Sequence, residues 1–204
     1  MSESLADEHR LIDSRHRPTF DAVLALVRAR DDAWAVPPEG GAFLHALALA
    51  RSARNAVELG TSYGYSTLWI AAALQQTGGR LTTFDREPRK AEAARDHLRQ
   101  AGLSDRVDCR VGVIAEMLAS IRGPIDFVFI DADKPASLGY LQQLRPHLAD
   151  GAVVVTDNLI RPQHDWTEFL AAVRGDPGLF SMLVPVGNGM ELTILRGSAA
   201  RSGT

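Results

Sequence analysis

Short apolar runs recur along the chain from residue 55 onward, and they alternate with longer segments of helical periodicity. The run at 125–130 is apolar except for Asp126, and it has the length and the β-branched and aromatic content of a buried strand. Segments such as 21–30 and 42–53 instead repeat their apolar residues at helical spacing. The predicted strands are 55–59, 80–85, 106–111, 125–130, 152–156, 179–186 and 190–196, and the predicted helices are 21–30, 42–53, 65–76, 88–102, 114–121, 136–148 and 165–174.

Five strand–helix units are followed by two strands joined through Gly187, Asn188 and Gly189, which is a hairpin signal. Strands that alternate with helices favour a doubly wound, Rossmann-like α/β sheet that is mostly parallel, here with an antiparallel strand at its end and helices on both faces. We expect residues 1–204 to form one domain. Residues 1–53 would be an N-terminal helical extension, and 54–197 would be the Rossmann-like core.

Composition narrows the class of protein. The 204 residues carry a net charge of −3, and Lys and Arg do not cluster among aromatic residues, so nucleic acid is not an expected partner. Neither an apolar signal segment nor a membrane-spanning run is visible, and we therefore expect a cytoplasmic protein with no membrane partner. The single cysteine, Cys109, lies in an alternating strand-like run and is expected to be a packed structural thiol.

A glycine-containing turn follows the first predicted strand. Glu58 ends that strand, Gly60 and Gly64 punctuate the turn, and Ser66 opens the next helix. Glycine at such positions can take positive φ and allows a ligand close to the backbone, and the free N–H groups at a helix start favour polar or anionic ligand groups. The alternative is a structural strand–helix turn without a ligand.

Acidic residues end four of the apolar strands: Glu58, Asp85, Asp131 and Asp157. Parallel strands bring these ends to one edge of the sheet, where clustered carboxylates repel one another unless a metal or a cationic ligand compensates them. Asp85, at the end of the second strand, is the position that binds ribose hydroxyls in dinucleotide folds. The alternative for Asp85 is an acid that caps the following helix.

Asp131, Asp157 and Asn158 form a set of hard oxygen ligands that suits Mg²⁺. The chain has no Cys/His ligand cluster, which argues against zinc. Lys134 follows Asp131 by three residues, and an amine there could accept a proton in catalysis. The alternative for Lys134 is a surface lysine paired with Asp133.

Three blocks together carry a family resemblance: 58–66 (Glu-Leu-Gly-Thr-Ser-Tyr-Gly-Tyr-Ser), 129–134 (Phe-Ile-Asp-Ala-Asp-Lys) and 156–158 (Thr-Asp-Asn). With them, the chain resembles the cation-dependent class I O-methyltransferases, the group that contains the catechol and caffeoyl-CoA enzymes. The similarity runs from about residue 36 to 196. It implies a seven-stranded sheet with the last strand antiparallel, and S-adenosylmethionine (SAM) as methyl donor.

The resemblance also implies roles for individual residues. Glu58, Gly60, Tyr65 and Ser66 would hold the methionine part of SAM, Asp85 would bind its ribose, and the backbone at Gly112, Val113 and Ile114 would border its adenine. Val36, Thr61, Arg86 and Asp131 are further expected cofactor contacts. Asp131, Asp157 and Asn158 would ligate Mg²⁺ or another divalent cation such as Mn²⁺ or Ca²⁺, with Lys134 as base and Asp131 beside it.

The expected methyl acceptor is a hydroxyl of a small, catechol-like aromatic molecule, and Trp34, Trp166 and Met182 are candidates to line its pocket. Met182 stands where the animal catechol enzymes have an acid, so catechol itself is not established as the acceptor. The family also implies a homodimer through the N-terminal helices. Two alternatives remain: an NAD-dependent oxidoreductase, which would fit Gly60 and Asp85 but leave the Asp131 set unexplained, and a non-catalytic SAM-binding relative.

Overall fold

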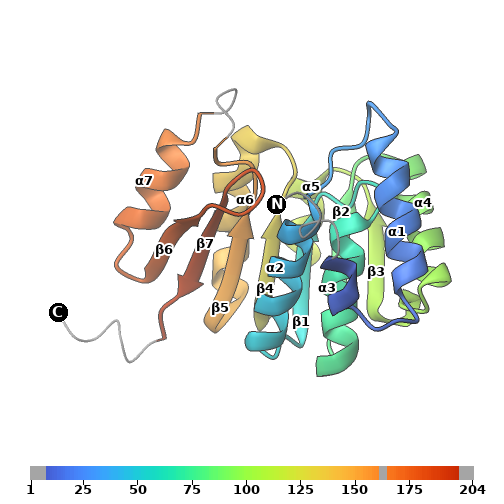
Figure 1. The fold of residues 1–204 in the computed structure, drawn as a ribbon. Coiled ribbons are helices and arrows are strands. Elements are labelled where there is room, and N and C mark those ends of the chain that lie inside the picture. Colours follow the sequence, from blue (N-terminus) through green and yellow to red (C-terminus); the bar gives the residue numbers. More distant parts are fainter. Residues whose placement is uncertain (1–7, 161–164, 198–204) are drawn as a thin grey trace.

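The computed structural model describes residues 8–160 and 165–197, and the strands in these ranges form one seven-stranded sheet (Figure 1). The strand order is β3-β2-β1-β4-β5-β7-β6. Strands β1 to β5 pair in parallel, while β7 is antiparallel to both of its neighbours, β5 and β6. The bounds are β1 Asn55–Leu59, β2 Arg80–Asp85, β3 Val107–Val111, β4 Ile125–Ile130, β5 Leu148–Thr156, β6 Leu179–Val184 and β7 Met190–Leu195.

The structure confirms the predicted sheet. It also shows that the last strand, β7, lies between β5 and β6, which leaves β6 at the edge. The order turns back at β1, because β2 and β3 lie on one side of it and β4 and β5 on the other. That reversal separates the loops that follow β1 and β4, and open α/β sheets bind ligands at such a point.

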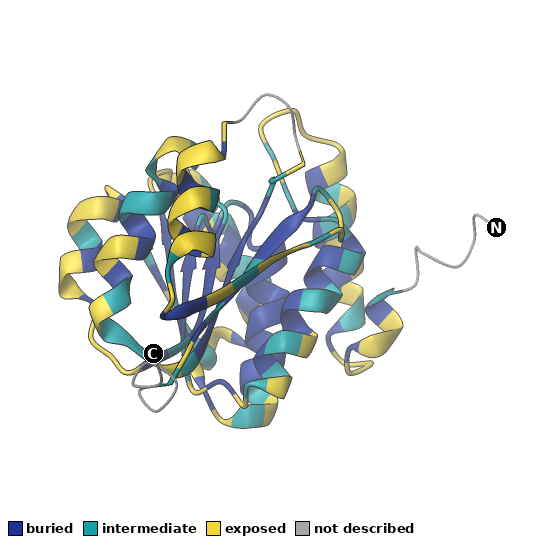
Figure 2. Cartoon of the chain, turned by 90° about the vertical axis from the view of Figure 1, so that its left-hand side faces the viewer, coloured by how far each residue is buried: buried dark blue, intermediate teal, exposed yellow. Residues whose placement is uncertain are grey.

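Helices cover both faces because alternate side chains of the central strands are apolar on both sides. Ala56 and Phe129 face the helices α1 to α4, whereas Val57 and Val128 face α5 to α7. The bounds are α1 Arg17–Arg28, α2 Pro38–Ala50, α3 Tyr65–Thr77, α4 Pro88–Gln100, α5 Ile114–Met117, α6 Ser137–Leu144 and α7 Thr167–Gly175. In Figure 2 the strands in the middle of the sheet are mostly buried, and the outer faces of the helices are exposed. The edge strand β6 is partly exposed.

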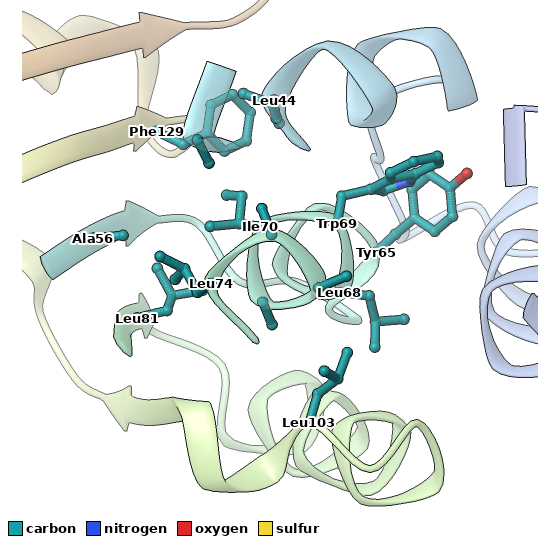
Figure 3. Close-up of a cluster of buried hydrophobic side chains, with 14 of the residues drawn as sticks. Leu44, Ala56, Tyr65, Leu68, Trp69, Ile70, Leu74, Leu81, Leu103 and Phe129 are labelled. Carbon is teal, nitrogen blue, oxygen red and sulfur yellow. The ribbon is translucent and has the colours of Figure 1, made fainter. Parts of the chain in front are cut away.

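Helix α3 lies at the centre of the larger core cluster, and every residue from Tyr65 to Leu74 is buried. Figure 3 shows Trp69 on this helix beside Tyr65, with Leu44 of α2 nearby. The ring of Phe20 from α1 meets Trp69 edge-on, with centroids 5.2 Å apart. Burial raises the pKa of the Cys109 thiol to about 12, as expected for a structural cysteine.

Several boundaries differ from the predictions: α2, for example, begins at Pro38 within the segment expected to be a break, α5 ends at Met117 and β6 ends at Val184. Prolines explain two further differences. Helix α1 begins at Arg17, one turn earlier than predicted, because Pro18 occupies its first turn. The segment predicted as one helix over 136–148 has its α-helical part only over Ser137–Leu144, since Pro146 cannot continue the hydrogen-bond ladder. Strand β5 then begins at Leu148 rather than at 152.

No helix in the described parts of the chain combines the length and the apolar character needed to cross a membrane.

Candidate active site

A cleft of about 590 Å³ opens at the carboxyl ends of β1, β2 and β4. Its walls come mainly from the segment between α1 and α2 and from the loops that follow β1, β2, β3, β4 and β5. The acids that end β2 and β4, Asp85 and Asp131, both line it. Parallel pairing of these strands therefore brings together residues that lie more than 45 positions apart in the sequence.

Gly60 and Gly64 both have positive φ, +104° and +85°, as the turn requires. The two glycines have different structural roles. A Cβ at Gly60 would lie 2.3 Å from the carbonyl oxygen of Asp131, so glycine allows the ends of β1 and β4 to meet at the cleft. A Cβ at Gly64 would lie 2.9 Å from the Cβ of Ala94, which makes Gly64 a packing residue between α3 and α4 rather than a point of ligand approach.

Glu58 lies directly behind the cleft and is fully buried. Its carboxylate accepts hydrogen bonds from three hydroxyls, those of Ser66 at 2.6 Å, Thr67 at 2.6 Å and Thr83 at 2.7 Å. Burial raises the pKa of Glu58 to about 7, the three hydrogen bonds oppose that shift, and the charge of Asp131 adds to it. Near neutral pH this carboxyl is therefore poised between its neutral and charged forms.

Asp85 is fixed at the rim of the cleft by two backbone N–H groups. Ser62 donates to one carboxylate oxygen at 2.6 Å and Glu87 donates to the other at 2.9 Å. The second contact closes a local turn before α4, whose N-cap residue is Glu87 and which has no side-chain cap hydrogen bond, so Asp85 does not cap the helix as the alternative interpretation supposed. The carboxylate also lines the cleft, so the structural role and a binding role are compatible.

Asp131, Lys134, Asp157 and Asn158 converge at the ends of β4 and β5. The amide nitrogen of Asn158 donates to Asp131 at 2.9 Å and to Asp157 at 3.1 Å. The Lys134 ammonium forms an ion pair with Asp131, and both side chains are largely buried. Among the described residues, no three His, Cys, Asp or Glu side chains form a metal-binding group, so a cation here would depend on two carboxylates and one amide.

Comparison with known proteins decides the family. A model of the methyltransferase domain matches residues 57–159, just over half of the chain. The catechol O-methyltransferase of Niastella koreensis is 40% identical over 149 residues, which cover 69% of this chain and 67% of that relative. The chain belongs to the O-methyltransferases of this family.

Solved structures of other O-methyltransferases have the same fold as this chain. The O-methyltransferase from Bacillus cereus, in complex with SAH, has a TM-score of 0.80 and 30% identity, and covers 88% of this chain and 91% of its own. The O-methyltransferase TomG from Streptomyces achromogenes, in complex with SAM, has a TM-score of 0.76 and 30% identity, and covers 91% of each chain. These likenesses confirm the predicted SAM-dependent methyltransferase, and they do not support the oxidoreductase alternative.

Most residues predicted to bind SAM, to ligate the cation or to act as base line the cleft of the methyltransferase, and some do not. Those that line it are Gly60, Thr61, Tyr65, Ser66, Asp85, Arg86, Val113, Ile114, Asp131, Lys134 and Asn158. Glu58 and Asp157 are buried behind the lining. Gly112 follows β3 outside the lining, and Val36 is buried in the core beside a smaller neighbouring groove.

The three candidates for the acceptor pocket of the methyltransferase have different surroundings. Trp34 lines the cleft and is 76% exposed. Trp166 is buried against Phe169 and donates its indole N–H to the carbonyl of Asn158 at 3.1 Å, so it supports the site from behind. Met182 lies half exposed on the edge strand β6, outside the cleft lining.

Sequence reasoning missed several residues of the site. Thr67 and Thr83 hold Glu58, and Ser62, Tyr63, Lys90 and Tyr140 line the cleft. Ser62 and Tyr63 lie between Gly60 and Gly64, so their place in the turn could have indicated that they line the cleft. For Lys90 and Tyr140 the sequence holds no local signal, because only the packing of α4 and α6 against the sheet turns them toward the cleft.

Proposed function

We propose that this methyltransferase transfers the methyl group of SAM to a hydroxyl of a small, catechol-like aromatic acceptor, with a divalent cation such as Mg²⁺ and with Lys134 as base. The observation that carries the proposal is the convergence of Asp131, Asp157 and Asn158 beside Lys134, at the edge of the cleft that Gly60 and Asp85 line.

The cleft suits a cationic, ribose-bearing cofactor. Glu58 and Asp85 supply negative charge near a sulfonium and an ammonium group, and the start of α3 offers backbone N–H groups to a carboxylate. Each oxygen of Asp85 accepts one backbone N–H, and a carboxylate has about four lone-pair sites, so capacity remains for ribose hydroxyls. The SAM-binding roles of Glu58, Gly60, Thr61, Tyr65, Ser66, Asp85, Arg86 and the segment 112–114 are part of this proposal.

The residue types at Asp131, Asp157 and Asn158 fit a hard divalent cation, because carboxylate and amide oxygens are ligands that Mg²⁺ prefers. Binding would require the Asn158 amide to turn its oxygen toward the cation in place of the nitrogen that donates to both carboxylates. Asn158 has φ +72°, a conformation that asparagine tolerates better than most residues, and Trp166 fixes its carbonyl. When bound, the cation would act as a Lewis acid toward two vicinal acceptor oxygens.

In its neutral form, which a cation bound at Asp131 would favour over the ammonium, the amine of Lys134 would accept the proton of the reacting hydroxyl. Asp131, only three residues away, holds this largely buried side chain at the cleft. The remaining contribution of the protein is alignment, since a fixed approach of oxygen to the methyl carbon lowers the entropic part of the barrier.

An aromatic acceptor is supported by two observations. The relative from Niastella koreensis is named a catechol O-methyltransferase, and the exposed indole of Trp34 lines the cleft with Ala35 and Pro135. A flat ring would bury its faces against such a surface. The homodimer and the cytoplasmic location remain predictions.

Methylation of a panel of catechols would test the proposal, using the unmodified protein, Asp157→Ala and Lys134→Ala at graded Mg²⁺. We expect EDTA and Asp157→Ala each to lower kcat/KM at least about 100-fold, because the donor set loses its cation or one of two carboxylates. We expect Lys134→Ala to lower kcat by about 100-fold or more, as for other acid–base residues.

Glu116→Gln is the matched control, because Glu116 is exposed on α5 and lies outside the cleft lining. Activity that survives both chelation and Asp157→Ala would refute the cation mechanism. SAM binding by calorimetry without turnover on any hydroxyl would instead indicate a binding protein.

A further inference from the structure

The segment 29–37, between α1 and α2, forms one wall of the cleft through Trp34 and Ala35. The turn after β1 forms the adjoining wall through Ser62 and Tyr63. The two walls are far apart in the sequence, so their separation depends on contacts between side chains. We call the first the 29–37 loop and the second the glycine turn.

Three side chains tie the two walls together, and we call Arg30, Asp32 and Tyr63 the clasp. The Tyr63 hydroxyl donates to Asp32 at 2.9 Å. The guanidinium of Arg30 lies 4.7 Å from the centre of the Tyr63 ring and donates to Asp32 at 2.8 Å. Each member therefore contacts the other two, and a closed triangle of this kind is more rigid than a single ion pair.

The glycine turn is the fixed side of this connection. Tyr63 is 8% exposed, and its carbonyl is hydrogen-bonded to the ring of His97 on α4 at 2.9 Å. The outer part of the 29–37 loop is attached less firmly: the side chains of Arg30 and Asp32 are 40% and 53% exposed, and the Trp34 indole N–H donates to the carbonyl of Asp31 within the same loop. At its inner side the loop contacts the core through Ala33, Ala35 and the buried Val36. Loss of the clasp would thus loosen the outer part of the loop, residues 30–34, and leave the turn in place.

The side chains of the clasp do not change their protonation near neutral pH. Arg30 first and Tyr63 second hold the pKa of Asp32 at about 2. Burial first and then the hydrogen bond to Asp32 raise the pKa of Tyr63 above its usual value. Lys90, whose ammonium lies 5.9 Å from the Tyr63 ring, is the other charged group that faces this tyrosine. The clasp is therefore a constant attachment and not a pH switch.

We propose that the clasp holds the 29–37 loop closed against the glycine turn and thereby sets the rate at which the cofactor leaves the cleft. The inference rests on the proposed function in one respect, because it assumes that this cleft holds SAM and its demethylated product S-adenosylhomocysteine. Arg30, Asp32 and Tyr63 act through the loop that carries Trp34, so they are positioning residues.

Dissociation of S-adenosylhomocysteine from immobilised full-length protein tests the clasp, since this ligand binds without reacting. Tyr63→Phe keeps the ring and removes only the hydroxyl, and Asp32→Asn removes the charge that pairs with Arg30. We expect each to raise the dissociation rate constant about three- to tenfold, which corresponds to the net loss of one ordinary hydrogen bond, because Asp32 is half exposed to solvent. The double variant should exceed the larger single effect by less than twofold, because both changes open the same triangle.

Asp13→Asn is the matched control. Asp13 pairs with Arg15 at 2.8 Å, also two residues apart in sequence and also exposed, but outside the cleft lining. We expect its dissociation rate constant to stay within twofold of the unmodified value. Circular dichroism of each variant checks that it is folded.

The association rate constant separates a clasp from a general structural role. If the variants only loosen the loop, the association rate constant of S-adenosylhomocysteine stays the same or rises. If they misform the pocket, that rate constant falls. Unchanged dissociation in both Tyr63→Phe and Asp32→Asn, or a fall in association, would overturn the clasp while the proposed function stands. Failure of the unmodified protein to bind S-adenosylhomocysteine would overturn both.

Discussion

Glu58 shows how a single residue can be poised by its surroundings. A carboxyl group with no exposed surface would ordinarily be neutral, yet three hydroxyls stabilise its charged form. The two effects leave its pKa at about 7, against 4.5 for an unperturbed glutamate. Folded protein therefore binds this proton more tightly than unfolded protein does.

The sign of the pH dependence follows from that difference. Between about pH 4.5 and 7 the folded state carries more protons at Glu58 than the unfolded state, so the free energy of unfolding falls as pH rises and levels off above the folded pKa. A shift from 4.5 to about 7 corresponds to about 3 kcal/mol. We expect urea unfolding at pH 5 and pH 8 to show this loss in the unmodified protein and not in Glu58→Gln. Glu116→Gln, exposed on α5, should retain the loss, and parallel pH profiles for all three proteins would contradict the assignment.

At the scale of elements, α3 joins the site to the core. Its first turn lines the cleft, its next two turns are buried on all sides, and Gly64 allows α4 to approach its start. The cleft and the packing of α3 on α4 therefore depend on the same few residues. A change that separates the two helices would also displace the glycine turn.

Gly64→Ala tests this coupling. The new Cβ would meet Ala94 at 2.9 Å in a residue with φ +85°, so steric overlap adds to backbone strain. We expect the free energy of unfolding to fall by about 2–4 kcal/mol. Gly102→Ala is the control, because Gly102 has φ +66° and no neighbour within 4 Å, and strain alone should cost about 1 kcal/mol. If Gly64→Ala and Gly102→Ala lowered the free energy of chemical unfolding equally, the contact with Ala94 would be unimportant.

At the scale of the whole molecule, a buried ion pair attaches α7 to the far side of the sheet. Glu191 of β7 has no exposed surface, and Arg174 of α7 donates to its two oxygens at 2.8 Å and 2.7 Å. The hydroxyl of Ser181 on β6 also donates to Glu191 at 2.8 Å. This group lies apart from the cleft lining, so its role is in stability.

We expect Arg174→Ala to lower the free energy of unfolding by about 3 kcal/mol, because it leaves a charge buried without its partner. This value is the lower end of the range of about 3–5 kcal/mol for breaking a buried ion pair, since the Arg174 side chain is 44% exposed and water can reach it. Glu191→Gln in the same protein should restore at least about 1 kcal/mol by removing that charge. Arg15→Ala, at a fully exposed pair, should leave the free energy of unfolding nearly unchanged in the same measurement.

The pattern of residues along the chain was enough to predict the elements, the sheet and the acids at the strand ends. Apolar periodicity is a local property, and parallel strands necessarily bring Asp85 and Asp131 to one edge. The glycine turn was likewise predictable, because few residues other than glycine adopt the φ of Gly60 and Gly64.

The contacts that support the site became visible only once the chain was folded. Thr83 reaches Glu58 from the neighbouring strand, Trp166 lies behind Asn158 instead of in the cleft, and Tyr63 meets Asp32 across 31 positions of sequence. Such contacts depend on strand register and on the angle at which each helix packs. Neither quantity is encoded in the neighbours of a residue along the chain, so no local pattern could have predicted them.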